Sequence, residues 1–203
     1  MSAAAGSGGT GAGGGRPLAG PTLPVLGGKV VLTALREEDI DRVVEACTTE
    51  QAQRWLDTPW PYARADAEGF VREFAPAGWR GEHDERVWAI RESLRGPLAG
   101  VIGLRGESTE VGFWRHPDAQ GKGLMADALR TLAGHAEGCL TWPEVHWGCY
   151  DGNVGSMRVA KAAGFSYLGT KESTQRGEPV LQHRAVRVAG GMPAGARPWP
   201  PLG

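Results

Sequence analysis

The stretch Glu110–Leu129, EVGFWRHPDAQGKGLMADAL, contains the change of pattern that decides the fold. Its first residues are typical of a short β-strand, and its last residues, rich in Leu and Ala, are typical of a helix. Between them, Gly121 and Gly123 lack a Cβ atom, so the backbone can approach a ligand closely there. The first amides of the following helix have no intrahelical partner and lie at the positive end of its dipole. The stretch therefore predicts a strand–loop–helix unit with an anion site suited to a diphosphate, and Lys122 adds a positive charge beside it.

Two other phosphate-binding motifs fit this loop less well. A P-loop requires a set glycine spacing before its lysine and Ser or Thr after it, and Lys122 has neither. Gly121, Gly123 and Ala126 formally satisfy the dinucleotide fingerprint G-x-G-x-x-G/A. In that fold, however, the strand runs almost directly into the first glycine, whereas residues 116–120 intervene here. We therefore disfavour both interpretations.

The patterns on either side of this stretch predict the rest of the fold. Short apolar runs separated by turn residues predict an antiparallel meander over residues 87–90, 98–104 and 110–114. Before it we expect a strand at 30–32 and amphipathic helices at 36–48 and 67–74, the second ending before Pro76. After it we expect a helix at 123–136, a strand at 145–150, a helix at 154–163, and strands near 165–169 and 182–188. The order β-α-α-β-β-β-α-β-α-β-β predicts an α/β fold with a mixed, mostly antiparallel sheet and helices on both faces.

Length, charge and cysteine content restrict the class of protein to which this fold can belong. A chain of 203 residues and 21.5 kDa leaves room for one domain of ordinary size. A formal net charge of −1 argues against nucleic acid as a partner. No apolar run is long enough to span a membrane and no signal peptide is recognisable, so we expect a cytoplasmic protein. Cys47, Cys139 and Cys149 are odd in number and lack CxxC spacing, so we expect neither disulfides nor a metal site.

Glycine and proline divide the chain into three parts. Residues 2–28 are mainly Gly, Ala, Ser and Pro, and such a segment buries too little apolar surface to offset the entropy of ordering. The same composition returns at residue 189. We therefore expect a disordered arm over 1–28, a domain over 29–188 and a flexible tail over 189–203.

Two motifs of the domain resemble the GCN5-related N-acetyltransferase (GNAT) family. Residues Gln120–Met125 resemble its acyl-CoA diphosphate loop, Q/R-x-x-G-x-G/A, although Met125 stands where Gly or Ala is usual. Only the backbone amide of that residue is needed for the phosphate. Asn153-x-x-Ser156, followed by a helix and Ala163-Gly164-Phe165, resembles the branch that contains the ribosomal-protein N-acetyltransferases RimJ and RimL. The resemblance covers about residues 29–188 and implies the GNAT fold, acetyl-CoA as co-substrate and an amine as acceptor. The residues that it assigns to acetyl-CoA binding are Phe113, Trp114, Arg115, Gln120, Gly121, Lys122, Gly123, Leu124, Met125, Asn153, Ser156 and Arg158.

Acetyl transfer from a thioester requires a neutral amine, so a base must remove the ammonium proton. The resemblance assigns this role to Glu110, and general-base assistance is typically worth about 10² to 10⁴ in rate. The alternative is a carboxylate that merely starts a strand. Glu172 is a reserve candidate for the base.

The departing thiolate and the oxyanion also need hydrogen-bond donors. The resemblance implies that Ser156 serves the sulfur, although Ser156 could instead only help Asn153 to close the first turn of its helix. Tyr150 and Cys149 are substitutes for it. For the oxyanion, the family supplies a backbone amide in the neighbourhood of Trp114. His116 is expected to be structural rather than catalytic.

Three functions are compatible with these residues. The first is acetylation of the N-terminal α-amine of a protein or peptide. The second is acetylation of a small-molecule amine such as an antibiotic or metabolite, and the third is a non-catalytic acyl-CoA sensor. Because dimers are frequent in the family, a homodimer is a further expectation.

Overall fold

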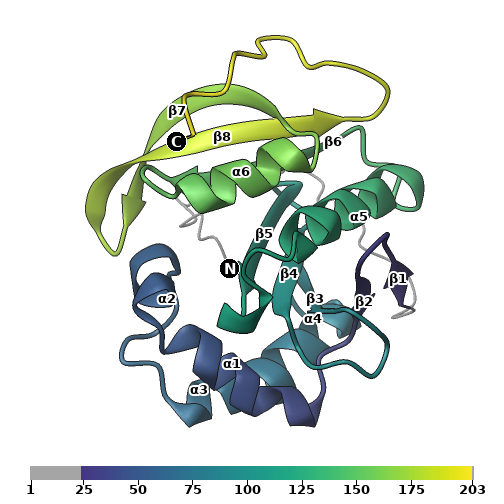
Figure 1. Ribbon diagram of the computed structural model, residues 1–203, viewed down its shortest axis with the longest axis vertical. Coiled ribbons are helices and arrows are strands. Elements are labelled where there is room, and N and C mark those ends of the chain that lie inside the picture. The colour runs from purple at the N-terminus through teal and green to yellow at the C-terminus, as the bar shows by residue number, and fades with distance from the viewer. Residues whose placement is uncertain (1–23, 203) are drawn as a thin grey trace.

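The computed structural model of the protein describes residues 24–202, so most of the predicted arm lies outside the described residues. Within that range the strands form one eight-stranded sheet in the order β1-β2-β3-β4-β5-β6-β8-β7 (Figure 1). Every neighbouring pair is antiparallel except β5 and β6. The strands are β1 (Val25–Leu26), β2 (Val31–Thr33), β3 (Glu85–Arg91), β4 (Gly100–Arg105), β5 (Glu110–Arg115), β6 (Glu144–Tyr150), β7 (Ser166–Gln175) and β8 (Glu178–Val188).

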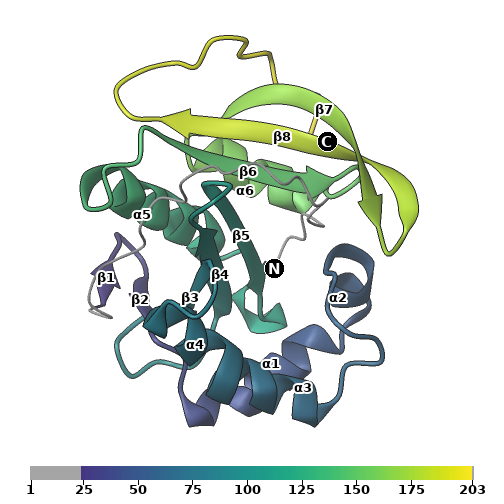
Figure 2. The same cartoon turned by 180° about the vertical axis from the view of Figure 1, so that it is seen from behind.

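Helices cover both faces of this sheet, as Figure 1 and the reverse view in Figure 2 show. Alternation along β3 explains the two layers, since successive side chains of a strand point to opposite faces. Val87 and Ala89 pack in one buried cluster with side chains of the N-terminal helices, whereas Trp88 and Ile90 pack in the other with α5. The helices are α1 (Ile40–Cys47), α2 (Glu50–Trp55), α3 (Arg64–Gly69), α4 (Ala75–Arg80), α5 (Leu124–Gly138) and α6 (Val154–Ala162), with short turns η1 (Glu37–Asp39), η2 (Phe70–Phe74) and η3 (Pro117–Ala119). Among the described residues, none of the helices is both long and apolar enough for a membrane span.

The predicted mixed sheet with helices on both faces is confirmed, but two helical predictions need correction. The helix expected to end before Pro76 continues to Arg80, through the π-helical turn η2. Pro76 lies in the first turn of α4, where a missing amide removes no helical hydrogen bond. The sequence prediction also lacks α2, which begins where the Thr49 side chain accepts a hydrogen bond from the Ala52 amide (3.1 Å).

The hairpin of β7 and β8 is longer than predicted. The expected strands near 165–169 and 182–188 extend to Gln175 and back to Glu178 through polar, mostly exposed residues that carry no apolar pattern. Its tip reaches the opposite part of the molecule. Gln175 Nε2 donates to the Arg54 carbonyl (2.9 Å), and Arg176 Nη2 donates to the Leu56 carbonyl (3.1 Å). The hairpin tip is thus joined to the end of α2.

Described residues also pack outside both expected ends of the domain. A small hairpin begins at Val25, earlier than the predicted start at residue 29. The tail expected to be flexible packs on the sheet: the Trp199 ring lies 6.1 Å from that of Trp147 and 5.1 Å from that of Tyr167. The Arg197 amide also donates to the Tyr167 carbonyl (2.8 Å). Composition did not reveal this docking because it depends on one aromatic side chain among Pro and Gly.

A buried ion pair joins η1 to the sheet. Arg91 Nη1 donates to Asp39 Oδ1 (2.9 Å), and the two side chains are 1% and 2% exposed. Arg91 also donates to the Thr33 hydroxyl and to the Gly96 carbonyl (both 3.0 Å), so its guanidinium is well satisfied. Removing one member of such a pair leaves the other charge buried without compensation.

We therefore expect Asp39→Ala to lower the free energy of unfolding by about 3 to 5 kcal/mol. Denaturant unfolding followed by tryptophan fluorescence measures this. The matched control is Glu37→Ala, which removes a carboxylate of the same turn that pairs with Arg72 on the surface. Solvent screens that pair, so we expect little change. Equal stability of the Asp39 variant and the unmodified protein would contradict the prediction.

Candidate active site

The sheet opens between β5 and β6. Their parallel register comprises only the pairs Glu110–His146 and Val111–Trp147, and no pair follows in the direction of α5. In Figure 1 the two strands separate from this point. The remaining length of β5 therefore presents an unpaired edge on the side of β6.

Along a strand, the main-chain N–H and C=O groups of successive residues point alternately to the two neighbouring strands. This alternation identifies the residues of β5 whose main-chain groups face the unpaired edge. The Thr109 carbonyl accepts a hydrogen bond from an amide of β6 (2.8 Å), whereas the His116 amide donates to a carbonyl just before β4 (2.9 Å). Phe113 and Arg115 lie an even number of residues after Thr109, so their amides point to the same side as the Thr109 carbonyl. That is the side that β6 leaves open. The amide of Trp114 faces β4. This refines the prediction of an oxyanion donor in the neighbourhood of Trp114.

The loop after β5 has the backbone that its glycines predicted. Gly121 and Gly123 have φ angles of 76° and 75°, which residues with a Cβ atom rarely adopt. The Gln120 amide still bonds back to the Pro117 carbonyl (3.0 Å). Beyond it, the amides of residues 121–126 have no hydrogen-bond acceptor in the described part of the chain. They form a row of free donors at the N-terminus of α5.

The side chains of this loop contribute less charge than expected. Lys122 Nζ forms an ion pair with Glu92 Oε1 (3.0 Å). Arg115 Nη2 donates to the side-chain oxygens of Gln51 (2.9 Å) and Gln120 (3.1 Å), and partial burial lowers the pKa of its guanidinium. The side chains of Leu124 and Met125 are buried in the core, so these residues offer a ligand only their backbone.

Glu110 lies at the start of β5, half-buried, on the same sheet face as Gly148 and Tyr150 of β6. A Cβ atom at Gly148 would lie 2.8 Å from Gln182 Nε2 and 3.4 Å from Glu110 Oε1, so the missing side chain leaves room for the Gln182 amide, and both groups lie next to this glycine. The Tyr150 hydroxyl donates to Asp57 Oδ2 (2.7 Å). Burial, this hydrogen bond and the charges of Asp57 and Glu110 all raise the pKa of the Tyr150 phenol, so it stays protonated. Asp57 was not predicted, because it lies in a loop without any motif.

Asn153 and Ser156 begin α6 as the capping pattern predicted. Asn153 Oδ1 accepts from the Ser156 amide (3.1 Å). The Ser156 hydroxyl is half-buried and has no partner among the described residues, so capping by Asn153 does not occupy it. Cys149 lies on the opposite sheet face from Tyr150, and burial raises the pKa of its thiol to about 12. The Tyr150 hydroxyl already donates to Asp57, so the geometry favours Ser156 over both Tyr150 and Cys149 as the donor to sulfur.

Two other predicted residues lie elsewhere. Lys171 of β7 is paired with Gln182 of β8, and Gln182 is paired with Tyr150 of β6, so these three side chains lie on the sheet face of Glu110. Glu172 is the residue after Lys171. Because neighbours in a strand alternate, Glu172 points to the face opposite Glu110, which argues against it as the reserve base.

Arg158, expected at the phosphates, lies on α6, where Arg158 Nη2 donates to the Leu202 carbonyl of the docked tail (2.6 Å).

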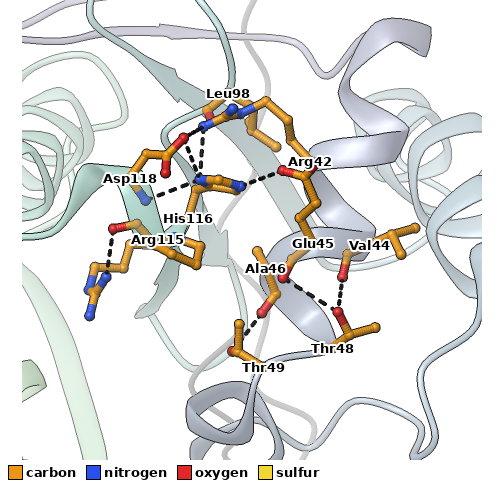
Figure 3. A network of polar contacts seen from close by, with 11 residues as sticks. Arg42, Val44, Glu45, Ala46, Thr48, Thr49, Leu98, Arg115, His116 and Asp118 are labelled. Carbon is orange, nitrogen blue, oxygen red and sulfur yellow. Dashed lines mark hydrogen bonds and ion pairs between the residues drawn. The ribbon is translucent and has the colours of Figure 1, made fainter.

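His116 has a structural setting, which Figure 3 shows. Its Nδ1 accepts from the Asp118 amide (3.2 Å) and contacts Arg42 Nη2 (2.8 Å), while Nε2 lies 2.9 Å from Glu45 Oε2. These contacts fit a ring whose Nδ1 accepts and whose Nε2 donates. His116 thus ties α1 to η3 and fixes the direction in which the chain enters the glycine loop.

Comparisons with known proteins identify the family and the fold. Residues 29–166 match the family described as "Acetyltransferase (GNAT) domain", and the chain therefore belongs to the GNAT acetyltransferases. None of the curated protein sequences matches significantly.

Several solved structures share the fold. RimL, described as a ribosomal L7/L12 alpha-N-protein acetyltransferase in complex with coenzyme A, has TM-score 0.66 and 19% identity, covering 82% of this chain and 98% of that one. A GNAT-family acetyltransferase from Bacillus anthracis has TM-score 0.70 and 16% identity, covering 82% and 98%. The microcin C7 self-immunity acetyltransferase MccE, in complex with acetyl-CoA and AMP, has TM-score 0.67 and 17% identity, covering 80% and 93%.

We expect Gly123→Asp to abolish binding of acetyl-CoA, because a side chain and a negative charge would enter the row of free amides. Calorimetric titration with acetyl-CoA measures this. Gly134→Asp controls for the added side chain and charge: it lies within α5, at a position where a Cβ atom meets nothing within 4 Å. Unchanged affinity in the Gly123 variant would show that the diphosphate binds elsewhere.

Proposed function

We propose that this protein transfers the acetyl group of acetyl-CoA to a primary amine, and that its acceptor is the N-terminal α-amine of a protein or peptide. The observation that carries the proposal is the row of free amides at residues 121–126, which continues the free edge of β5. Amides at a helix N-terminus bind phosphate, and strand-edge amides bind the amide groups of an extended chain. Pantetheine attached to a diphosphate has that chemistry.

The reaction assigns one role to each group near the opening. Glu110 takes the ammonium proton of the acceptor, and the neutral nitrogen then attacks the thioester carbonyl. An amide of Phe113 or Arg115 donates to the oxyanion that forms. The attached nitrogen then loses its second proton to water. When the carbon–sulfur bond breaks, the Ser156 hydroxyl donates a hydrogen bond to the departing thiolate, which takes up a proton from water.

The carboxylates around Tyr150 favour a cationic amine as the acceptor. The carboxylates of Asp57 and Glu110 both lie near Tyr150 and attract an ammonium group. An α-amine fits because its pKa of about 7.7 to 8 leaves part of it neutral at physiological pH. RimL, a structural neighbour, is described as an alpha-N-protein acetyltransferase.

A small-molecule amine is the second candidate. Gln175 and Arg176 join the tip of the β7–β8 hairpin to the end of α2, beside the sheet face that carries Glu110 and Tyr150. This connection restricts the space for an acceptor, which favours a compact acceptor over a bulky one. An acyl-CoA sensor without turnover is a third outcome of the test below. A homodimer and a cytoplasmic location stay predictions.

Incubation with acetyl-CoA and a panel of acceptors tests the function. The panel contains peptides with free α-amines, the same peptides with blocked α-amines, and small amines, and the readouts are free CoA thiol and mass spectrometry of the acetylated product. We expect acetylation of free α-amines. Exclusive acetylation of small amines would support the second candidate, and tight binding without turnover would support the sensor.

We expect Glu110→Gln to lower turnover by about 10² to 10⁴ at neutral pH, with the affinity for acetyl-CoA little changed. The loss should shrink as pH rises above about 8, because the α-amine then loses its proton to water. Steady-state rates across pH measure this. The matched control is Glu107→Gln, an exposed carboxylate in the preceding turn. A normal rate at every pH would remove Glu110 from the mechanism.

A further inference from the structure

The diphosphate loop needs a counter-charge that its own side chains do not supply freely. Lys122 is paired with Glu92 and Arg115 is turned toward two glutamines. A diphosphate carries negative charge that the free amides only partly balance. A cation from another part of the chain would complete the site.

Lys29 is such a cation. A Cβ atom built on Gly123 would lie 3.5 Å from Lys29 Nζ, so the ammonium group lies beside the glycine that immediately precedes α5. Lys29 is exposed, and its ammonium has no ion-pair partner in the described range 24–202. An uncompensated charge beside a row of free donors attracts an anion.

The fold holds Lys29 at this place by its backbone. The Lys29 amide donates to Asp127 Oδ2 on α5 (2.6 Å). The turn before it packs closely, since a Cβ atom at Gly27 would lie 2.4 Å from Thr131 Oγ1 and 2.8 Å from Asp127 Oδ2. Only glycine permits this approach. Figure 1 shows β1 and β2 beside α5.

Asp127 does not cancel the charge of Lys29 Nζ. Its Oδ2 accepts from the Lys29 amide, and its Oδ1 accepts from Arg130 Nη1 (3.2 Å). The carboxylate is 11% exposed and is therefore engaged as an anchor for the turn. The backbone of Lys29 is thus fixed to α5 by Asp127, whereas its side chain stays available to a ligand.

We infer that Lys29 binds the diphosphate of acetyl-CoA, an assignment that rests on the proposed function. The turn between β1 and β2 then forms a second wall of the phosphate site, opposite the glycine loop. An ammonium group is a compact point charge that suits a phosphate oxygen. Because Lys29 Nζ lies beside Gly123, the phosphates bound by the loop amides are its neighbours. The 3′-phosphate of the nucleotide is the other source of the same chemistry.

Three ligands and three variants test this assignment. The ligands are acetyl-CoA, acetyl-3′-dephospho-CoA and acetyl-pantetheine, and calorimetry measures the Kd of each. The variants are Lys29→Met, Lys29→Arg and, as a matched loss of one exposed charge, Lys171→Met on β7. Thermal melting shows that each variant folds.

We expect Lys29→Met to weaken acetyl-CoA and acetyl-3′-dephospho-CoA by about tenfold each, and acetyl-pantetheine hardly at all. Lys29→Arg should restore most of the affinity, and Lys171→Met should change little. Unchanged affinity in Lys29→Met, or equal weakening of all three ligands, would overturn the inference. A loss confined to acetyl-CoA would assign Lys29 to the 3′-phosphate instead and would also overturn it. If the unmodified protein binds none of the ligands, the proposed function fails first.

Discussion

The pairing of β5 with β6 is the constraint on which the rest of the structure depends. It is the only parallel pair of the described sheet, and it stops after two residue pairs. A parallel pair requires a crossover connection, and α5 provides it. The helix therefore begins at the end of β5, beside the edge that β6 leaves free. Strand amides and helix amides become neighbours because of this one connection.

Local patterns were enough to predict the parts of the fold that have their own periodicity. The strand–glycine loop–helix unit of residues 110–129 lies as expected because its apolar spacing and its glycines act locally. Pro76 misled the prediction because its place in the first turn of α4 depends on the preceding π turn. Trp199 misled it because docking is a tertiary event that composition does not record.

The candidate site was predictable only where one segment carries it. Glu110, the glycine loop, and Asn153 with Ser156 belong to motifs, and the structure places them on β5, before α5 and at the start of α6 as those motifs predicted. Asp57 and Lys29 come from loops whose residues have no periodic signal. Only the tertiary fold brings Asp57 to Tyr150 and Lys29 to Gly123. Glu172 was misplaced because the direction of a side chain depends on register, which its neighbours in sequence did not reveal.

The docked tail gives the C-terminal segment a mechanical connection to the opening. Trp199 is wedged against the sheet, and Arg158, one turn into α6, bonds the backbone at Leu202. Any polypeptide fused beyond Leu202 would pull on a partly buried anchor and, through it, on the helix that carries Ser156.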